Sequence, residues 1–168
     1  MSTPQDQPKV LRETDDAARS QACSILRQAR VAALATHEAG TAWPLASRVS
    51  LANMEDGCLV ILISRLSAHF AALEGDARCS LLVNEAEKDG DPLRVARMTV
   101  MCSAMRLDRV VQTQARAHAR EAFLRHIPEA EMYADFGDFD FWQLRIVRAS
   151  LNAGFGRAYA LSAQDLRP

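Results

Sequence analysis

The sequence has little excess charge of either sign and no long apolar run. Its 20 Lys and Arg against 21 Asp and Glu leave a formal net charge of -1. This balance argues against a nucleic-acid-binding protein, because such proteins carry a surplus of Lys and Arg. No apolar segment approaches the roughly 20 residues that a membrane-spanning helix needs. The polar start, MSTPQDQPKV, lacks the apolar core of a secretory signal, so we expect a cytoplasmic protein.

Cysteines and histidines are few, and their spacing excludes several kinds of site. The cysteines at positions 23, 58, 79 and 102 form no CxxC pair, and the four histidines form no HExxH motif. We therefore expect reduced, buried thiols, and neither a disulfide framework nor a bound metal. The sequence also lacks GxSxG, a P-loop and GxGxxG. Hydrolase, nucleoside-triphosphatase and Rossmann chemistry consequently have no support.

The patterning that is present predicts one globular domain rich in strands. Hydrophobic residues make up 49% of the 168 residues, as in ordinary globular domains. Amphipathic spacing predicts a helix over 15–30 with Thr14 as its N-cap, and a short helix over 67–75. A further helix is expected over 113–126, with an inner face of Ala115, Ala119, Ala122 and Phe123. Strands are predicted over 31–36, 42–53, 58–64, 79–84, 95–107 and 140–149.

Short turns join the early strands, which favours antiparallel pairing. Segment 58–64, CLVILIS, is apolar throughout, so we expect it to be buried on both faces. These features predict a β-rich α+β fold, a small antiparallel Greek-key β-barrel of about six strands flanked by short helices; the family resemblance given below implies that this barrel is a split barrel. Residues 1–13 are expected to form a flexible arm, and residues 14–168 the single domain.

A candidate anion site follows the strand over 58–64. Ser64 and Arg65 end this strand, and Ser67 and His69 begin the next helix. A helix N-terminus attracts anions through its free N–H groups and partial positive charge, and hydroxyl, guanidinium and imidazole groups add donors. Arg48, on a neighbouring strand, is a candidate to converge on the same place. The same residues also fit a simple alternative, in which Ser67 only caps its helix and Arg65 and His69 are solvated.

The order of these segments resembles the FMN-binding split-barrel superfamily of pyridoxamine-5′-phosphate-oxidase-like proteins, and within it the haem-utilisation branch. The resemblance implies a homodimeric FMN-dependent oxidoreductase with the cofactor at the interface and a small-molecule substrate. It covers roughly residues 15–166. The segments that carry it are RQARVAALAT (27–36), PLASRVSLA (44–52), LISRLSAHFAAL (62–73), GDPLRVARMTVMCSAMRL (90–107), MYADFGDFDFWQL (132–144) and AGFGRAYAL (153–161).

The resemblance also implies how the cofactor is held along two strands. Arg48 would contact the FMN phosphate, and Val49 and Ser50 would lie along the ring system or the ribityl chain. Ile63 would line the cofactor through its backbone and Ser64 through its hydroxyl. The loop around Gly154 and Gly156 would lie near the cofactor cleft, unless it is an ordinary glycine turn.

The phosphate cradle departs from the family pattern. Ser67 and His69 would complete it, but pyridoxamine-phosphate oxidases commonly carry Ser-Arg-Lys where this sequence has Ser67, Ala68 and His69. One cation is therefore lost and another is replaced by a group that titrates near neutral pH. Arg65 is the candidate to compensate. The departure argues against pyridoxamine phosphate as the substrate.

Haem and a deazaflavin are the alternative cofactors. Some members of the haem-utilisation branch bind haem through a histidine in a C-terminal loop, but this sequence has no histidine after His126. The other functions left open are a non-catalytic flavin or haem binder and a haem-degrading enzyme with another ligand such as His69. No side chain stands out as a catalytic acid, base or nucleophile. Asp135, Asp138 and Asp140 are interpreted as a loop that leads into a strand.

Overall fold

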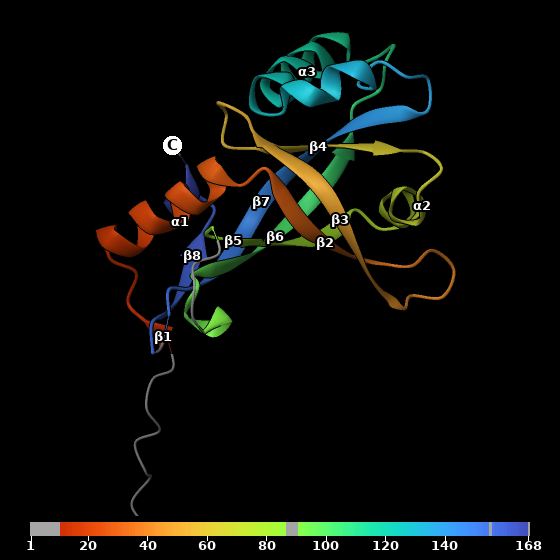
Figure 1. Ribbon diagram of the computed structural model, residues 1–168. Helices are drawn as coiled ribbons and strands as arrows, with labels where there is room; N and C mark the ends of the chain where they lie inside the picture. Colours follow the sequence, from red (N-terminus) through yellow and green to blue (C-terminus); the bar gives the residue numbers. More distant parts are fainter. Residues whose placement is uncertain (1–10, 87–90, 155, 168) are drawn as a thin grey trace, which may run out of the picture.

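The computed structural model describes residues 11–86, 91–154 and 156–167, so most of the predicted arm lies outside the described residues. Within these ranges every predicted helix and strand is present (Figure 1). The helices are α1 (Asp16–Gln28), α2 (Ala68–Gly75) and α3 (Thr113–His126), with short 3-10 turns η1 (Pro92–Arg94), η2 (Pro128–Met132) and η3 (Gln164–Leu166). The strands are β1 (Leu11–Arg12), β2 (Val31–His37), β3 (Pro44–Asn53), β4 (Leu59–Ser64), β5 (Arg78–Asn84), β6 (Arg97–Arg106), β7 (Phe139–Asn152) and β8 (Ala158–Ser162).

Six antiparallel strands close into a barrel in the order β7-β4-β3-β2-β5-β6, because β6 also pairs with β7. β5 crosses over to pair with β2 rather than with β4, which precedes it in sequence. Two further strands extend the sheet beyond β7: β8 pairs with it, and β1 pairs with β8 in parallel. The predicted antiparallel Greek-key split barrel of about six strands is therefore confirmed.

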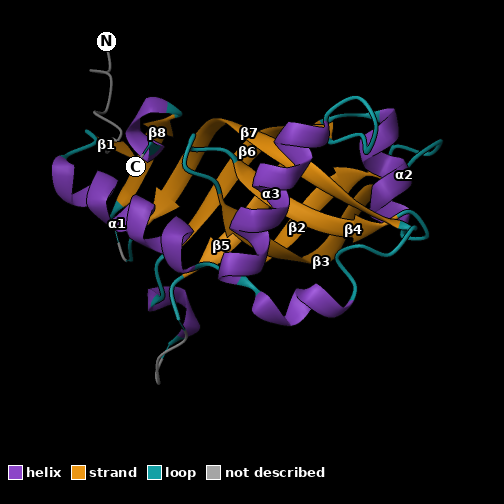
Figure 2. Cartoon of the chain, turned by 90° about the horizontal axis from the view of Figure 1, so that it is seen from above, coloured by secondary structure: helices purple, strands orange, loops and turns teal. Residues whose placement is uncertain are grey.

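β4 is buried on both faces, as its continuous apolar character predicts. Leu59, Ile61 and Ile63 point into the barrel, whereas Val60 and Leu62 pack beneath α3. Figure 2 shows α3 lying across this outer side of the sheet. A second, smaller core thus forms between α3 and the barrel, and it fixes the strand that leads into the candidate site.

The remaining helices close the barrel at opposite ends, α1 at one and α2 at the other (Figure 1). Ile25 and Leu26 of α1, and Phe70 and Leu73 of α2, belong to the same buried cluster as the inward-facing strand residues. Phe70 meets Trp142 edge-to-face at 5.4 Å between ring centroids. α2, which begins just after the candidate anion site, is therefore anchored by its apolar face.

Two local predictions are wrong. α1 is capped by Asp15 rather than by Thr14: the Asp15 carboxylate accepts a hydrogen bond from the Ala18 N–H at 2.7 Å. The Thr14 hydroxyl instead donates to the Ala160 carbonyl of β8. Ala115 of α3 is exposed, because α3 meets the sheet from Ala119 onward.

Among the described residues, no helix combines the length and the apolar character that crossing a bilayer requires.

The cysteines give a test of the barrel interior. Cys79 and Cys102 are buried cross-strand partners, and burial raises the pKa of the Cys79 thiol to about 12 and raises that of Cys102 as well. The prediction of buried thiols is wrong for Cys23 and Cys58, which are partly exposed, and burial with the nearby Asp56 raises the pKa of Cys58. Because thiolates react with DTNB, we expect Cys23 to label first in the native protein, Cys58 more slowly, and the buried pair only after unfolding. Counting released thionitrobenzoate with and without guanidinium measures this. Four rapidly reacting thiols in the native protein would contradict the packing.

Candidate functional site

The candidate site lies where the barrel opens between β3 and β4. The two strands pair only over residues 51–53 and 59–61, although β3 begins at Pro44 and β4 continues to Ser64. Beyond these pairs the strands diverge toward α2, as Figure 1 shows. Extending the same register would place Arg48 opposite Ser64. Two unpaired strand edges therefore flank the opening.

The β3 residues predicted to bind cofactor alternate between the two sides of the strand. Arg48 is exposed and Ser50 is half-buried, so both side chains face outward beside the opening. Val49, 4% exposed, belongs to the barrel core, so it has only its backbone to offer a ligand. Within the described chain Arg48 makes no hydrogen bond or ion pair with another side chain. Its guanidinium can therefore bind a ligand at this edge without first breaking an ion pair within the described part of the protein.

The hydroxyl groups beyond β4 are already engaged within the protein. The Ser64 hydroxyl donates to the Asp138 carboxylate at 2.8 Å and accepts from the Leu66 N–H at 3.2 Å. Ser67 occupies the predicted N-cap position of α2, but its hydroxyl donates to the Ser64 carbonyl at 2.7 Å instead of capping the helix. Ile63 is buried in the core, as expected for a residue that offers only backbone. Both hydroxyl protons therefore stabilise the loop itself.

Two backbone donors at the start of α2 are not engaged. In the described part of the chain, the N–H groups of Ala68 and His69 have no hydrogen-bond partner, whereas the Phe70 N–H bonds the Ser67 carbonyl. Such groups, with the partial positive charge of the helix end, suit an anion.

The His69 ring is half-buried, and burial lowers the pKa of its imidazole below the ordinary value of 6.5. At neutral pH this ring therefore carries little charge.

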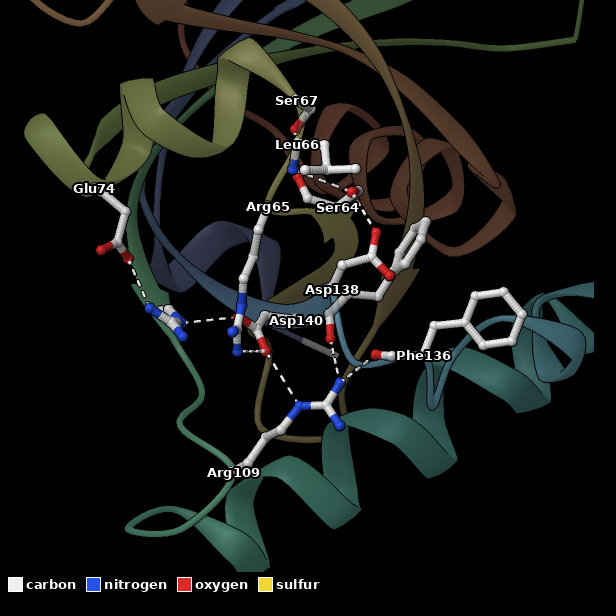
Figure 3. Close-up of polar contacts among 11 residues, drawn as sticks. Ser64, Arg65, Leu66, Ser67, Glu74, Arg109, Phe136, Asp138 and Asp140 are labelled. Atoms are coloured by element: carbon white, nitrogen blue, oxygen red, sulfur yellow. Dashed lines mark hydrogen bonds and ion pairs between the residues drawn. The ribbon is translucent and has the colours of Figure 1, made fainter.

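Arg65 is directed to a carboxylate rather than to the start of α2 (Figure 3). Its guanidinium donates to Asp140 from two nitrogens, at 2.8 and 3.2 Å. Asp140 is 1% exposed and also faces Arg106 at 3.0 Å and Arg109 at 3.4 Å. Burial by itself raises the pKa of the Asp140 carboxyl, but the three guanidinium groups outweigh it and hold the pKa below its usual value. We call these four residues the Asp140 cluster.

The segment over 136–140 is tied to the loop over 64–67 by backbone bonds as well. The Arg65 N–H donates to the Asp138 carbonyl at 2.7 Å. Arg109 donates from one nitrogen to the carbonyls of Phe136 and Phe139, each at 2.6 Å. The interpretation of these aspartates as a loop leading into a strand places them correctly, but it misses the network. The sequence did contain one indication of this network. Asp140 lies two residues before the inward-facing Trp142 on the same strand, so its side chain shares the buried face and needs a partner there.

The C-terminal glycine loop is not near the opening in the same chain. Gly154 and Gly156 adopt positive φ angles of +109° and +67° in the turn between β7 and β8, and Phe155 lies outside the described residues. This turn is at the far end of β7 from Phe139, which pairs with Ser64. Within a single chain the loop is therefore an ordinary glycine turn, and it does not approach the opening between β3 and β4.

Comparison with known proteins adds family and fold. A family model described as CREG, beta-barrel, matches residues 13–166. The chloroplastic heme oxygenase HOZ of Arabidopsis thaliana is 32% identical over 108 residues, which are 63% of this chain and 31% of that protein. The structure of a heme binding protein from Mycobacterium smegmatis is 28% identical, with a TM-score of 0.80 over 92% of this chain and 61% of that one. This chain thus spans about a third of HOZ and less than two thirds of the mycobacterial chain.

A third structure supports the fold alone. It is a Clostridium acetobutylicum protein of the pyridoxinephosphate oxidase family, with 8% identity and a TM-score of 0.66 over 91% of this chain and 99% of that one. The fold of the predicted relatives, the pyridoxamine-phosphate-oxidase-like split barrel, is therefore confirmed, and a heme oxygenase and a heme binding protein are among the proteins that this chain resembles.

Proposed function

Because this chain belongs to the CREG beta-barrel family, we propose that it binds FMN at the opening between β3 and β4 and acts as a homodimeric oxidoreductase on a small molecule. One observation carries the proposal. Extending the β3–β4 register sets Arg48, whose guanidinium has no side-chain partner among the described residues, opposite Ser64. Four residues after Ser64, α2 begins with the Ala68 and His69 N–H groups, which have no hydrogen-bond partner in the same part of the chain. A cation and a helix N-terminus are the groups that recognise a phosphate.

The side chains present fit the phosphate end of FMN in a specific way. Arg48 supplies the charge, and α2 supplies two amide donors. Ser50 lines the outward face of β3, and Ile63 and Val49 contribute backbone only. Ser64 and Ser67 shape the loop through their hydroxyls. When bound, FMN supplies the electron chemistry, while the protein binds and orients it.

A second copy of the chain is expected to cover the outer side of β2, β5 and β6. This face carries a cleft of about 450 Å³ whose lining includes the small residues Ala35, Ser80 and Ser103 and the arginines Arg78 and Arg148. Leu82 and Val147, on the same strands and on β7, are 41% and 50% exposed. Exposed apolar surface of this kind marks an interface. Light scattering of the purified chain is expected to give twice the monomer mass.

The titration of His69 predicts a pH dependence of FMN binding. Burial lowers the pKa of this imidazole, and a neighbouring phosphate would raise it again, so binding takes up a proton. We expect the ratio of wild-type to His69→Gln affinity for FMN to rise as pH falls from 8 to 5.5, by at most about 10-fold for each unit of pKa that binding restores. Free FMN ionises identically in the two experiments, so the ratio reports the ring together with its coupling to the bound phosphate. Parallel affinity curves would refute a contact.

Haem binding is the second candidate function, and the similarity to the heme oxygenase HOZ and to the mycobacterial heme binding protein favours it. Among the described residues, His69 at the start of α2 is the candidate axial ligand, and it lies where the FMN phosphate would bind. His118 is exposed on α3. The His126 ring shares a hydrogen bond with the Ala29 carbonyl, and His37 lies 3.6 Å from Asp76. The C-terminal turn, β8 and η3 contain no histidine. Flavin therefore remains the better match to the groups present.

Absorption spectra separate these candidates. The full chain is incubated with FMN, with a deazaflavin or with haemin, and unbound ligand is removed by gel filtration. We expect FMN bands to stay with the protein and to bleach when NADPH or NADH is added. A retained Soret band without retained flavin would favour the haem candidate. Tight FMN binding without reduction by either nucleotide would favour a non-catalytic flavin binder.

A further inference from the structure

We propose that Arg65, through Asp140, positions the loop over 64–67 for phosphate binding and does not itself contact the phosphate. The inference rests on the proposed FMN site and assigns roles within it. It makes Arg48 the cation that touches the ligand. It also gives the buried Asp140 a role in holding the phosphate site.

The geometry of Arg65 favours a supporting role. Its guanidinium presents Nε and one terminal nitrogen to the two oxygens of Asp140, the bidentate arrangement that fixes an arginine side chain most firmly. In Figure 3 the side chain runs from the loop toward Asp140 and away from Ser67. A ligand phosphate would have to draw it away from a carboxylate that is 1% exposed. That move would break two charge-assisted hydrogen bonds to a buried carboxylate, although Arg106 and Arg109 would still face it.

The charge balance around Asp140 also favours a supporting role for Arg65. Three guanidinium groups and three carboxylates meet here, so their formal charges cancel. A site that binds an anion through these arginines would need a positive excess. The groups counted are Arg65, Arg106, Arg109, Asp138, Asp140 and Glu74.

The network acts on the loop at three points. Arg65 holds it through the side chain to Asp140 and through its backbone N–H to Asp138. The Ser64 hydroxyl adds a bond to the Asp138 carboxylate. Since α2 begins directly after this loop, these bonds set where the free N–H groups of Ala68 and His69 point. Loosening the loop should therefore weaken phosphate binding without removing a charge from the ligand.

The salt dependence of binding distinguishes the two roles of arginine. The dissociation constants of FMN and riboflavin are measured by flavin fluorescence between 20 and 500 mM NaCl for the full chain. An exposed cation that pairs with phosphate is screened by salt. We expect Arg48→Ala to flatten the salt dependence of FMN binding. We expect Arg65→Ala to weaken FMN binding about 3- to 10-fold, with the wild-type salt dependence and unchanged riboflavin binding.

Ser64→Ala gives an independent reading, because it cuts the bond to Asp138 without altering charge. It is expected to weaken FMN binding in the same way as Arg65→Ala, so the test stands even if the arginine variant does not fold. A flattened salt dependence in Arg65→Ala would overturn the inference, as would FMN binding unaffected in the loop variants. If the wild type does not prefer FMN to riboflavin, the proposed function itself fails, and that outcome is read before any variant is compared.

Discussion

Replacing Arg48 by alanine lowers the affinity for FMN by about 10- to 100-fold and leaves the affinity for riboflavin unchanged. The expected loss corresponds to one charge-assisted hydrogen bond, about 1.5–3 kcal/mol. Arg48 is exposed on β3 and makes no bond that the fold would lose. The truncation therefore removes a ligand contact and little else. Riboflavin, which has no phosphate, reports any change in the rest of the site.

Arg27→Ala is the matched control for this variant. Arg27 is an exposed arginine on α1, at the opposite end of the barrel from α2. It removes the same charge, so it corrects for any general effect of net charge on an anionic ligand. An equal loss in both arginine variants would show that the effect is not local. Equal weakening of FMN and riboflavin in Arg48→Ala would show that Arg48 does not recognise the phosphate.

Replacing Asp140 by alanine is expected to lower the free energy of unfolding by about 3–5 kcal/mol, the usual effect of removing one partner from a buried ion pair. Asp140 is 1% exposed, and without it Arg65, Arg106 and Arg109 would face one another in a half-buried site. Urea unfolding in a Trp43→Phe background measures this. Trp43 is 72% exposed and Trp142 only 2%, so the remaining emission follows the core.

Asp135→Ala is the matched control for Asp140→Ala. Asp135 also pairs with an arginine, Arg120, but its side chain is 57% exposed, so its loss should cost about 0–1 kcal/mol. The wild-type advantage over Asp140→Ala should be complete above the ordinary Asp pKa of about 4 and decline as pH falls through the lower pKa of folded Asp140. Equal costs for the two aspartates would contradict the structural role assigned to the cluster.

Periodicity was sufficient to predict the barrel. α3 begins and ends at the predicted residues, and the all-apolar segment over 58–64 becomes a strand buried between two cores. These features are local: the alternation of side chains along a strand and the 3.6-residue repeat of a helix determine which face is apolar. The Asp15 cap was missed because adjacent Thr14 and Asp15 both satisfy the same local rule.

The candidate site was only partly predictable, because its partners come from distant strands. Ser64 and His69 were proposed from a strand end and a helix start, and Arg48 from its place on the neighbouring strand together with the family resemblance. The pairing of Arg65 with Asp140 depends on the β4–β7 register, which joins residues 75 positions apart and leaves no local trace. The Ser67 hydroxyl likewise donates to the Ser64 carbonyl and does not accept from an N–H of α2, a choice between two short-range partners that residue type does not decide.

The ratio of riboflavin to FMN dissociation constants for the wild-type chain tests the central claim most directly. Both ligands carry the same ring system, so their ratio reports the phosphate alone. A phosphate held by Arg48 and the start of α2 predicts FMN binding at least about 10-fold tighter than riboflavin binding at low salt. Equal affinities, or no binding of either flavin, would contradict the assignment of the opening between β3 and β4 as a flavin phosphate site.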